Sequence, residues 1–551
     1  MNCFQKTSML LVCFCISASL AAQDTIVKAD INAAAKLADI QFTQPEVDMM
    51  YTDVKDNLKD IEKMHRLKLD NSVPMSLWQS PLLPGMKLPV NQKPINWNIP
   101  KNVELPKNRN ELAFYSIPQL ASLLRNKKIS SVELTKFFIE RIRKYGDSLQ
   151  CVISITEDIA MKQAATADAE LKAGLHRSIL QGIPYGLKDL FSVTGTKTTW
   201  GAAPYKEQVI DADAFVYTEL ETAGAVLVAK FTLGALAMGD YWFGGRTKNP
   251  WNLKFGSSGS SAGSASATVA GLVPFAIGTE TYGSIVSPSN ACGATGLRPT
   301  FGSVSRSGAM ALSWSLDKIG PLCRSAEDAA AVFSVIHGTD GKDGSAVNAA
   351  FNYTGTTDFK KLKIAYVKNY FDKLDSNANE PKVLDEYRKL GATLVPIEII
   401  DSVLYPFDMI GVVIGSESAA AFDDLTRMNI DDQLTRQTRN DWPNYFRSAR
   451  LIPAVEYVNT NRHRYRLMQD MAKIVNQYDA IITPTFGGSQ TAITNLTGYP
   501  VVCMPTGFNK NKTPTSITII GKLYDEATIL AVAKAYQQAT AWDDMHPEMF
   551  R

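Results

Sequence analysis

Histidine is scarce in this chain and scattered along it. Five histidines occur among 551 residues, and none forms an HExxH motif or a Cys/His cluster. Zinc chemistry and a histidine-based catalytic triad are therefore both disfavoured. The phosphate-binding patterns GxGxxG and GxxxxGK[ST] are also missing. The sequence thus predicts no metal and no cofactor, and if the chain is a hydrolase its general base is not histidine. The histidines are His65, His176, His337, His463 and His546.

An excess of charge of one sign is equally missing. The chain has 57 Lys and Arg against 55 Asp and Glu, a net charge of +2. Such a balance provides no basic surface to attract nucleic acid or anionic lipid, so neither is an expected partner. With 45% hydrophobic and 20% charged residues, the composition is that of a folded globular protein with a large core.

The N-terminal segment has the pattern of a secretory signal peptide. Lys6 is its only charged side chain, an apolar stretch begins at Met9, and small residues follow at Ser19, Ala21 and Ala22. The apolar part is shorter than the ~20 residues that a membrane-spanning helix needs. We expect cleavage near residue 22 and export to the periplasm or the medium, without stable membrane insertion. A retained anchor is the alternative.

Cysteine is sparse beyond this segment. Cys151, Cys292, Cys323 and Cys503 are widely spaced, and no CxxC pair occurs among them. Buried thiols are expected rather than disulfides, because a chain of this length can build a core without covalent crosslinks. The spacing leaves disulfides open as an alternative.

The order of patterns along the chain predicts an α/β fold with one large domain. Residues 23–112 begin with a polar, helical rhythm and continue into a tether rich in proline and asparagine. Ser130 and Glu133 then form a capping box before an amphipathic helix that we expect to end at Gly146. Short apolar runs alternate with helical stretches as far as residue 520, which indicates a sheet with helices on both faces over residues 113–551. These runs begin at Cys151, Ala225, Lys363, Asp479, Pro500 and Ser516.

Residues 256–266 are the most unusual stretch, because nine of the eleven are glycine or serine. A flexible linker is one interpretation, but apolar, core-like sequence follows directly. A phosphate-binding loop is a second, although its lysine is missing. The third is a tight, serine-lined loop beside an active site, where glycine permits close approach of the backbone.

With its surroundings, this loop resembles the amidase signature family of serine hydrolases. Three blocks match in order: GIPYGLKDLFSVTGTKTTWGA from Gly182, the Gly/Ser loop, and GTETYGSIVSPSNACGATGLRPTFGSVSRSG from Gly278. A weaker match, TNLTGYPVVCMPTG, begins at Thr494. The run GTETYGSI is similar to the peptide-amidase branch. The resemblance implies the family's α/β/α fold and hydrolysis of an amide without a cofactor.

Carried over residue by residue, the resemblance implies a catalytic trio of Lys188, Ser260 and Ser284. Ser284 would be the nucleophile, and Ser260, which follows a cis peptide bond in the family, would relay its proton to Lys188. The backbone N–H groups of Thr281, Tyr282, Gly283 and Ser284 would form the oxyanion hole. Met238 aligns with a substrate-facing position, although a core methionine is the alternative.

The sequence differs from the commonest family motif at two positions near the nucleophile. Tyr282 replaces a frequent glycine, which puts the local backbone geometry in question. Val286 replaces an arginine that often follows the nucleophile, which favours a neutral, peptide-like amide over an acidic substrate. Asp317 is expected to hold a loop. Asn352 and Asn495 begin Asn-x-Thr triplets that fit the glycosylation pattern.

The chemistry of the trio makes sense from its residue types. A serine hydroxyl needs a base, and a lysine can act as that base only when it is neutral. Burial among apolar groups and hydroxyls lowers a lysine pKa from about 10.4 and so provides a neutral amine. We therefore predict an exported amidase acting on a small-molecule or peptide amide. The alternatives are an esterase, an amidotransferase subunit, which a secretory signal does not suit, and a catalytically inactive binding protein, which the presence of all three residues disfavours.

The sequence leaves the substrate and the oligomeric state open. Residues 401–477 lie between the family blocks and are expected to shape the substrate pocket. Their aromatic and arginine side chains are where specificity would be sought.

Overall fold

The computed structural model describes residues 26–67, 69–400 and 404–551. The predicted signal peptide lies outside these residues. The chain divides into two compact units, with the boundary between Asp70 and Asn71. In the described part of the chain, no helix has the length and apolar character needed to cross a membrane.

The described residues of the first unit form two helices, α1 (Lys28–Leu37) and α2 (Gln44–His65). Thr43 and Glu46 form a capping box at the start of α2, with the Thr43 N–H donating to the Glu46 carboxylate at 2.6 Å. The Tyr51 hydroxyl donates to the carbonyl of Ile26 at 2.8 Å and ties the two segments together. The helical pattern predicted for the start of residues 23–112 is present as α1 and α2.

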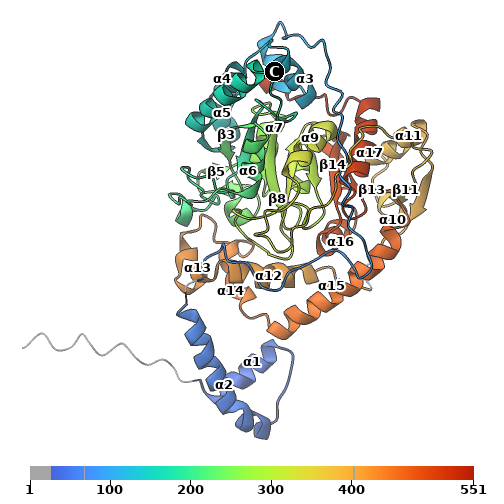
Figure 1. Ribbon diagram of the computed structural model, residues 1–551. Coiled ribbons are helices and arrows are strands. Elements are labelled where there is room, and N and C mark those ends of the chain that lie inside the picture. The colour runs from blue at the N-terminus through green and yellow to red at the C-terminus, as the bar shows by residue number, and fades with distance from the viewer. Residues whose placement is uncertain (1–25, 68, 401–403) are drawn as a thin grey trace, which may run out of the picture. The chain divides into compact units, whose positions relative to one another are not determined.

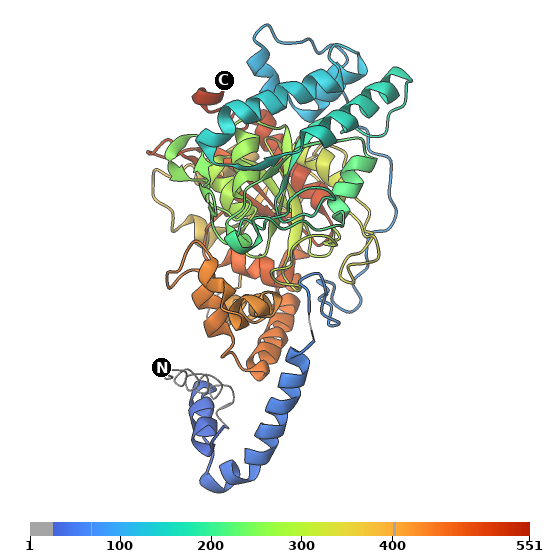
Figure 2. The same cartoon turned by 90° about the vertical axis from the view of Figure 1, so that its left-hand side faces the viewer.

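The second unit is built around an eleven-stranded mixed sheet (Figures 1 and 2). Its order is β1-β3-β2-β8-β10-β9-β14-β15-β13-β11-β12. The strands are β1 (Val152–Ile155), β2 (Pro184–Lys188), β3 (Val226–Phe231), β8 (Phe275–Glu280), β9 (Thr295–Arg298), β10 (Lys318–Cys323), β11 (Ile364–Val367), β12 (Leu394–Ile397), β13 (Ala480–Pro484), β14 (Val501–Phe508) and β15 (Pro514–Ile520). The pairs β2–β3 and β2–β8 are parallel, whereas β8–β10 is antiparallel. Two hairpins accompany the sheet: β4 (Tyr241–Trp242) with β5 (Gly245–Arg246), and β6 (Lys248–Asn249) with β7 (Asn252–Gly256).

Both faces of the sheet are buried, which confirms the α/β prediction. In β3, Leu227 joins one hydrophobic cluster while its neighbours Val226 and Val228 join another. In β14, Val502 and Val501 divide between two clusters in the same way. Because neighbouring side chains of a strand point to opposite faces, apolar side chains on both sides require helices on both sides.

Helices flank the sheet (Figure 1). They are α3 (Ile117–Arg125), α4 (Ser131–Leu149), α5 (Glu157–Lys172), α6 (Phe215–Thr222), α7 (Ala262–Val269), α8 (Val286–Cys292), α9 (Ala326–Ile336), α10 (Lys368–Phe371), α11 (Glu380–Lys389), α16 (Gln490–Thr497) and α17 (Glu526–Ala539). Between β12 and β13 the chain inserts α12 (Met409–Ala421), α13 (Asp423–Arg427), α14 (Trp442–Ala449) and α15 (Ala454–Val475). Short 3-10 helices occur at Arg109–Phe114, Ala203–Tyr205, Ala235–Ala237, Ile430–Gln433 and Glu548–Phe550.

The predicted capping box of α4 is confirmed, but its predicted end is wrong. The Glu133 carboxylate accepts the Ser130 N–H at 2.9 Å. The helix runs past Gly146 to Leu149 and ends at Gln150, which takes a left-handed conformation. Gly146 serves packing instead, since a Cβ there would lie 2.9 Å from the side chain of Val152.

Residues 71–112 belong to the second unit and have little regular structure. The Asn71 side chain donates to the carbonyl of Ala311 and accepts the N–H of the same residue, both at 2.9 Å. Further along, the Gln92 side chain bonds both the N–H and the carbonyl of Phe351 at 2.8 Å. This predicted tether is thus fastened to the unit that carries the sheet.

The four cysteines of the described chain are buried free thiols, as expected: Cys151, Cys292, Cys323 and Cys503. The two Asn-x-Thr triplets are engaged in the fold. Asn352 accepts the Lys93 N–H at 2.7 Å, and Asn495 is fully buried. A glycan on Asn495 is therefore excluded by the folded structure.

Candidate active site

Lys188, the last residue of β2, is completely buried among hydroxyl groups. Its Nζ donates to Ser260 Oγ and Thr279 Oγ1, both at 2.8 Å, and to Ser261 Oγ at 3.3 Å. Burial lowers the pKa of Lys188 to about 7, against the opposing effect of Asp317 and Glu280. The lysine is therefore poised to exchange a proton near neutral pH.

The Gly/Ser stretch runs from the end of β7 into α7, and residues 257–261 form the loop between these two elements. The peptide bond between Gly259 and Ser260 is cis, as the resemblance implies. Gly259 has no room for a side chain, because a Cβ would lie 1.8 Å from the carbonyl oxygen of Gly239. Ser257, Ser260 and Ser261 are buried, which excludes the flexible-linker interpretation.

Ser284 stands in the loop between β8 and α8, next to the Gly/Ser loop. The Ser261 N–H donates to the Ser284 carbonyl at 3.1 Å and joins the two loops. Ser284 is 7% exposed, more than Ser260 at 1%. Within the described residues, its hydroxyl makes no hydrogen bond. This hydroxyl is thus the one of the predicted trio that a substrate can approach.

The same loop presents unused backbone donors. Among the described residues, the N–H groups of Tyr282, Gly283 and Ser284 find no internal acceptor. Unpaired backbone N–H groups beside a nucleophilic hydroxyl are the donors that an oxyanion hole uses. The predicted oxyanion residues thus include three free donors.

Glu280 closes this loop from behind. Its Oε2 accepts the N–H groups of Ile285 at 2.8 Å and Val286 at 3.0 Å. Its Oε1 accepts from Arg298 at 2.8 Å and from the Asn495 amide at 2.9 Å. Burial would raise the pKa of Glu280, but Arg298 and Lys318 with the hydrogen bonds lower it to about 2. A permanent carboxylate therefore holds the two residues that follow Ser284.

Asp317 holds the other side of the loop, in keeping with its predicted role. Its carboxylate accepts the Thr281 hydroxyl at 2.6 Å and the N–H groups of Leu312 and Ser313. Burial raises its pKa, although these hydrogen bonds oppose the rise. Sequence reasoning did not identify Thr279, Glu280 or Arg298. Glu280 had a visible signal, an acidic residue four positions before the nucleophile in GTETYGS.

Lys188, Ser260 and Ser284 come from three separate blocks and meet at one place in the fold. The sequence profile of the amidase family matches residues 133–530, which include all three. The chain belongs to the amidase signature family. It is accordingly an enzyme that acts on C–N bonds.

Relatives of this amidase-signature chain include enzymes of different kinds. A glutamyl-tRNA(Gln) amidotransferase subunit of Coxiella burnetii is 34% identical over 481 residues, which cover 79% of this chain and 99% of that protein. The crystal structure of the peptide amidase from Stenotrophomonas maltophilia is 28% identical, with a TM-score of 0.70 over 78% of this chain and 97% of that one. An amidase family protein from Bacillus anthracis has 25% identity and a TM-score of 0.72, over 80% of this chain and 94% of its own.

The two departures from the commonest amidase-signature text fit the structure. Tyr282 does not take a positive φ, so its backbone does not require the usual glycine, whereas Gly283 has a φ of 86°. The Tyr282 side chain is 47% exposed. The Val286 side chain is buried in the core, so it offers no contact to a substrate.

Met238 lies in a tight turn whose next residue, Gly239, abuts Gly259. Its side chain is half-buried and packs against the main hydrophobic cluster. This placement is close to the Gly/Ser loop, and a contact with substrate stays a prediction. No group of three or more His, Cys, Asp or Glu among the described residues could hold a metal ion.

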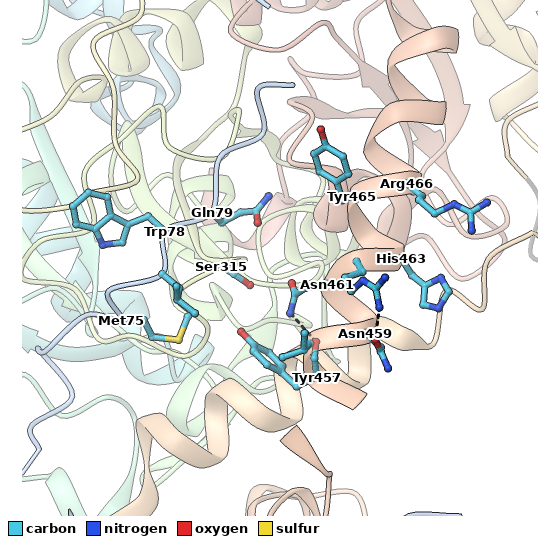
Figure 3. A pocket seen from close by; sticks show the side chains of 13 residues that line it. Met75, Trp78, Gln79, Ser315, Tyr457, Asn459, Asn461, His463, Tyr465 and Arg466 are labelled. Carbon is cyan, nitrogen blue, oxygen red and sulfur yellow. Dashed lines mark hydrogen bonds between the residues drawn. The ribbon is translucent and has the colours of Figure 1, made fainter. Parts of the chain in front are cut away.

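A cavity of about 700 Å³ lies between residues 75–79 and α15, and none of the trio lines it. In Figure 3, Tyr457 and Asn461 face Ser315 and Gln79, whereas His463 and Arg466 point away. The Tyr457 hydroxyl donates to Glu417 at 2.8 Å. Residues of the 401–477 insertion thus line this cavity, while their effect on the substrate stays a prediction.

Proposed function

We propose that this chain is an exported amidase that hydrolyses a carboxamide through an acyl-enzyme on Ser284. The observation that carries the proposal is the 2.8 Å contact of Lys188 Nζ with Ser260 Oγ, in surroundings that lower the lysine pKa to about 7. Neutral Lys188 is then a general base of suitable strength at physiological pH.

In acylation, Ser284 Oγ attacks the amide carbon while its proton passes to Ser260 Oγ. Ser260 gives its own hydroxyl proton to Lys188, which becomes an ammonium ion. The carbonyl oxygen takes up negative charge and receives the N–H groups of Tyr282, Gly283 and Ser284. Loss of one such donor typically costs about 3 kcal/mol of transition-state stabilisation.

Collapse of the tetrahedral intermediate breaks the C–N bond. The leaving nitrogen takes its proton from Lys188 through Ser260 and departs as ammonia or an amine, leaving an ester on Ser284. Water then attacks this ester, giving up a proton along the same path. The products are a carboxylic acid and free Ser284, so Lys188 ends each cycle as a neutral amine.

The substrate that we propose is a neutral, peptide-like amide. Two observations support it: Val286, two residues after Ser284, is a buried apolar side chain where the family often has an arginine, so no cation stands there to pair with an acidic substrate, and the peptide amidase is among the solved relatives. Export follows from the N-terminal pattern of residues 1–22. N-terminal sequencing of protein recovered outside the cytoplasm should begin near Gln23. A start at Met1 would contradict cleavage and favour a retained anchor, whereas a chain found only in the cytoplasm would overturn export.

An amidotransferase subunit is a second candidate, because the Coxiella burnetii relative is 34% identical over nearly its whole length. Such a subunit would release ammonia for transfer to charged tRNA within a complex with a partner protein. Purified mature chain alone should hydrolyse peptide amides under the proposal. Hydrolysis that appears only after a partner is added would favour the second candidate.

Matched amide and ester substrates with the same acyl group test amidase against esterase. The proposal expects turnover of the amide and, when the ester is mixed in excess, an increase in intact mass equal to the acyl group less the one hydrogen that it replaces on Ser284. Turnover of the ester alone would make the chain an esterase. The absence of both turnover and acyl adduct would overturn the mechanism.

A further inference from the structure

A tryptophan of the insertion is bonded to the turn that carries Met238. Trp442 is the first residue of α14, at the end of the second unit where α12, α13 and α14 gather (Figure 1). Its side chain is buried, and its indole N–H donates to the carbonyls of Ala235 at 3.1 Å and Leu236 at 3.0 Å. The Trp442 indole N–H, shared between these two carbonyls, thus links the 401–477 insertion to the turn at residues 235–237.

The turn that receives this donor has an unfavourable backbone. Leu236 and Ala237 have φ angles of 49° and 65°, a left-handed conformation that residues with a Cβ rarely adopt. Such residues persist only where their surroundings hold them. The Trp442 N–H supplies part of that support, and the Trp200 carbonyl, which accepts the Leu236 N–H at 2.9 Å, supplies another part.

The turn packs directly against the loop that carries Ser260, the predicted proton relay. The Gly239 carbonyl oxygen occupies the space where Gly259 would carry a side chain, 1.8 Å from the Cβ position. Ser260 follows Gly259 and bonds Lys188. A shift of the turn would therefore move the Gly259–Ser260 peptide and change the distance from Ser260 Oγ to Lys188 Nζ.

An aromatic cluster connects the same tryptophan to the lysine side of the site. The Trp442 and Phe446 rings stack with centroids 4.8 Å apart, Phe446 lies 5.5 Å from Phe422, and Phe422 lies 6.0 Å from Trp200. The backbone N–H of Trp200 donates to the backbone carbonyl of Asp189, the residue after Lys188, at 3.1 Å. The aromatic cluster thus connects to Lys188 through the backbone of Trp200, and to Ser260 through Trp442 and the turn that it bonds.

We propose that Trp442 is a positioning residue that sets the Lys188–Ser260 contact through its indole N–H, an inference that rests on the proposed catalytic roles of these two residues. The hydrogen bond of the indole N–H, and not only the packing of the ring, maintains the distance between Ser260 Oγ and Lys188 Nζ. The insertion therefore contributes to the rate of acylation as well as to the fold.

The test replaces the N–H while keeping the ring. Trp442→Phe keeps an aromatic ring against Phe446, and substitution by the benzothienyl analogue of tryptophan, with sulfur in place of N–H, keeps the full bicyclic shape. The readouts are the second-order rate of labelling by a fluorophosphonate, kcat and KM for a peptide amide, and Tm. Tyr445→Phe on the same helix is the control, because Tyr445 is 41% exposed and the substitution keeps the ring that lies edge-on to Trp442.

Both replacements of Trp442 should slow labelling and lower kcat at least fivefold, with KM within twofold and Tm nearly unchanged for the benzothienyl form. The control should match the wild type. Labelling by the benzothienyl form at the wild-type rate would overturn the inference, as would a loss of activity that only follows a loss of folded protein. A wild-type chain that takes no label at all would instead count against the proposed function.

Discussion

Lys188 Nζ lies 2.8 Å from Ser260 Oγ and equally close to Thr279 Oγ1, with Ser261 Oγ at 3.3 Å. An ammonium ion has three N–H donors, so the charged lysine can satisfy all three hydroxyls. The neutral amine has two donors and one lone pair, which can accept a proton from Ser260 while Thr279 and Ser261 receive the other two hydrogens. The same three neighbours thus suit both states that a proton relay needs.

Activity should rise with pH through a pKa near 7 and then level off. Below that pH, Lys188 is an ammonium ion and cannot accept the proton of Ser284. Lys188→Arg should lose as much activity as Lys188→Ala, at least about a thousandfold, because a guanidinium remains charged. Measurement of kcat/KM from pH 5 to 10 checks both statements, and an arginine variant with near-wild-type turnover would remove Lys188 from the mechanism.

The stability of the fold should also depend on this lysine. Its pKa is about 7 in the folded state and about 10.4 in the unfolded chain, so between these values the unfolded state binds more protons. The free energy of unfolding should therefore increase with pH across that window, by on the order of 1 kcal/mol per pH unit. Lys188→Met should remove this contribution.

Urea unfolding of the wild type and of Lys188→Met at pH 7, 8 and 9 measures the difference. Other buried groups titrate in both proteins, and their contribution cancels in the comparison. Parallel pH dependence in the two proteins would show that the lysine is not neutral in the folded state.

Glu280→Gln should slow acylation by disturbing the oxyanion loop. A glutamine carries one acceptor in place of two, so either the Ile285 and Val286 N–H groups or the Arg298 guanidinium loses its partner. Breaking such a buried pair typically costs about 3–5 kcal/mol of stability. Since the Glu280 charge raises the pKa of Lys188, its removal should also move the acidic limb of the activity profile to lower pH.

Glu526→Gln is the matched control for this variant. Glu526 is also buried and accepts the Thr300 N–H at 2.8 Å, but it lies in α17, outside the loop. It should destabilise the protein while the activity of the folded fraction and its pH profile stay unchanged. An unchanged profile in Glu280→Gln as well would limit Glu280 to a structural role.

Gly259→Ala should inactivate the protein or prevent folding. The new Cβ would meet the Gly239 carbonyl oxygen at 1.8 Å, so the turn and the Ser260 peptide must separate. Overpacking of this kind costs about 1–3 kcal/mol or more. Gly411→Ala in α12, where a Cβ meets nothing within 4 Å, should be tolerated. Thermal melts and amide turnover of both variants test this, and an active Gly259→Ala protein would contradict the close packing.

The residues that the sequence predicted lie in contiguous motifs. Lys188, Ser260 and Ser284 each stand in a block whose glycines and small residues are required by the local backbone, such as Gly259 against Gly239. The buried strands were visible for a similar reason, because both faces of the sheet are apolar and produce unbroken hydrophobic runs.

The parts that were not predicted depend on contacts between distant residues. Asn495 meets Glu280 across 215 positions, and Trp442 meets Leu236 across 206. No local pattern encodes such pairs; the local pattern at Asn495 fits a glycosylation triplet and says nothing of Glu280. The end of α4 was misjudged because Gly146 is needed for packing against Val152 and not for a turn.

The most direct test of the account is the site at which a fluorophosphonate binds. The wild-type protein should take one equivalent, and peptide mass spectrometry should place it on Ser284. Ser284→Ala should take none while keeping its Tm, and Ser287→Ala, three residues further on, should label like the wild type. Probe on a serine other than Ser284 in the wild type, or undiminished labelling of Ser284→Ala, would contradict the account.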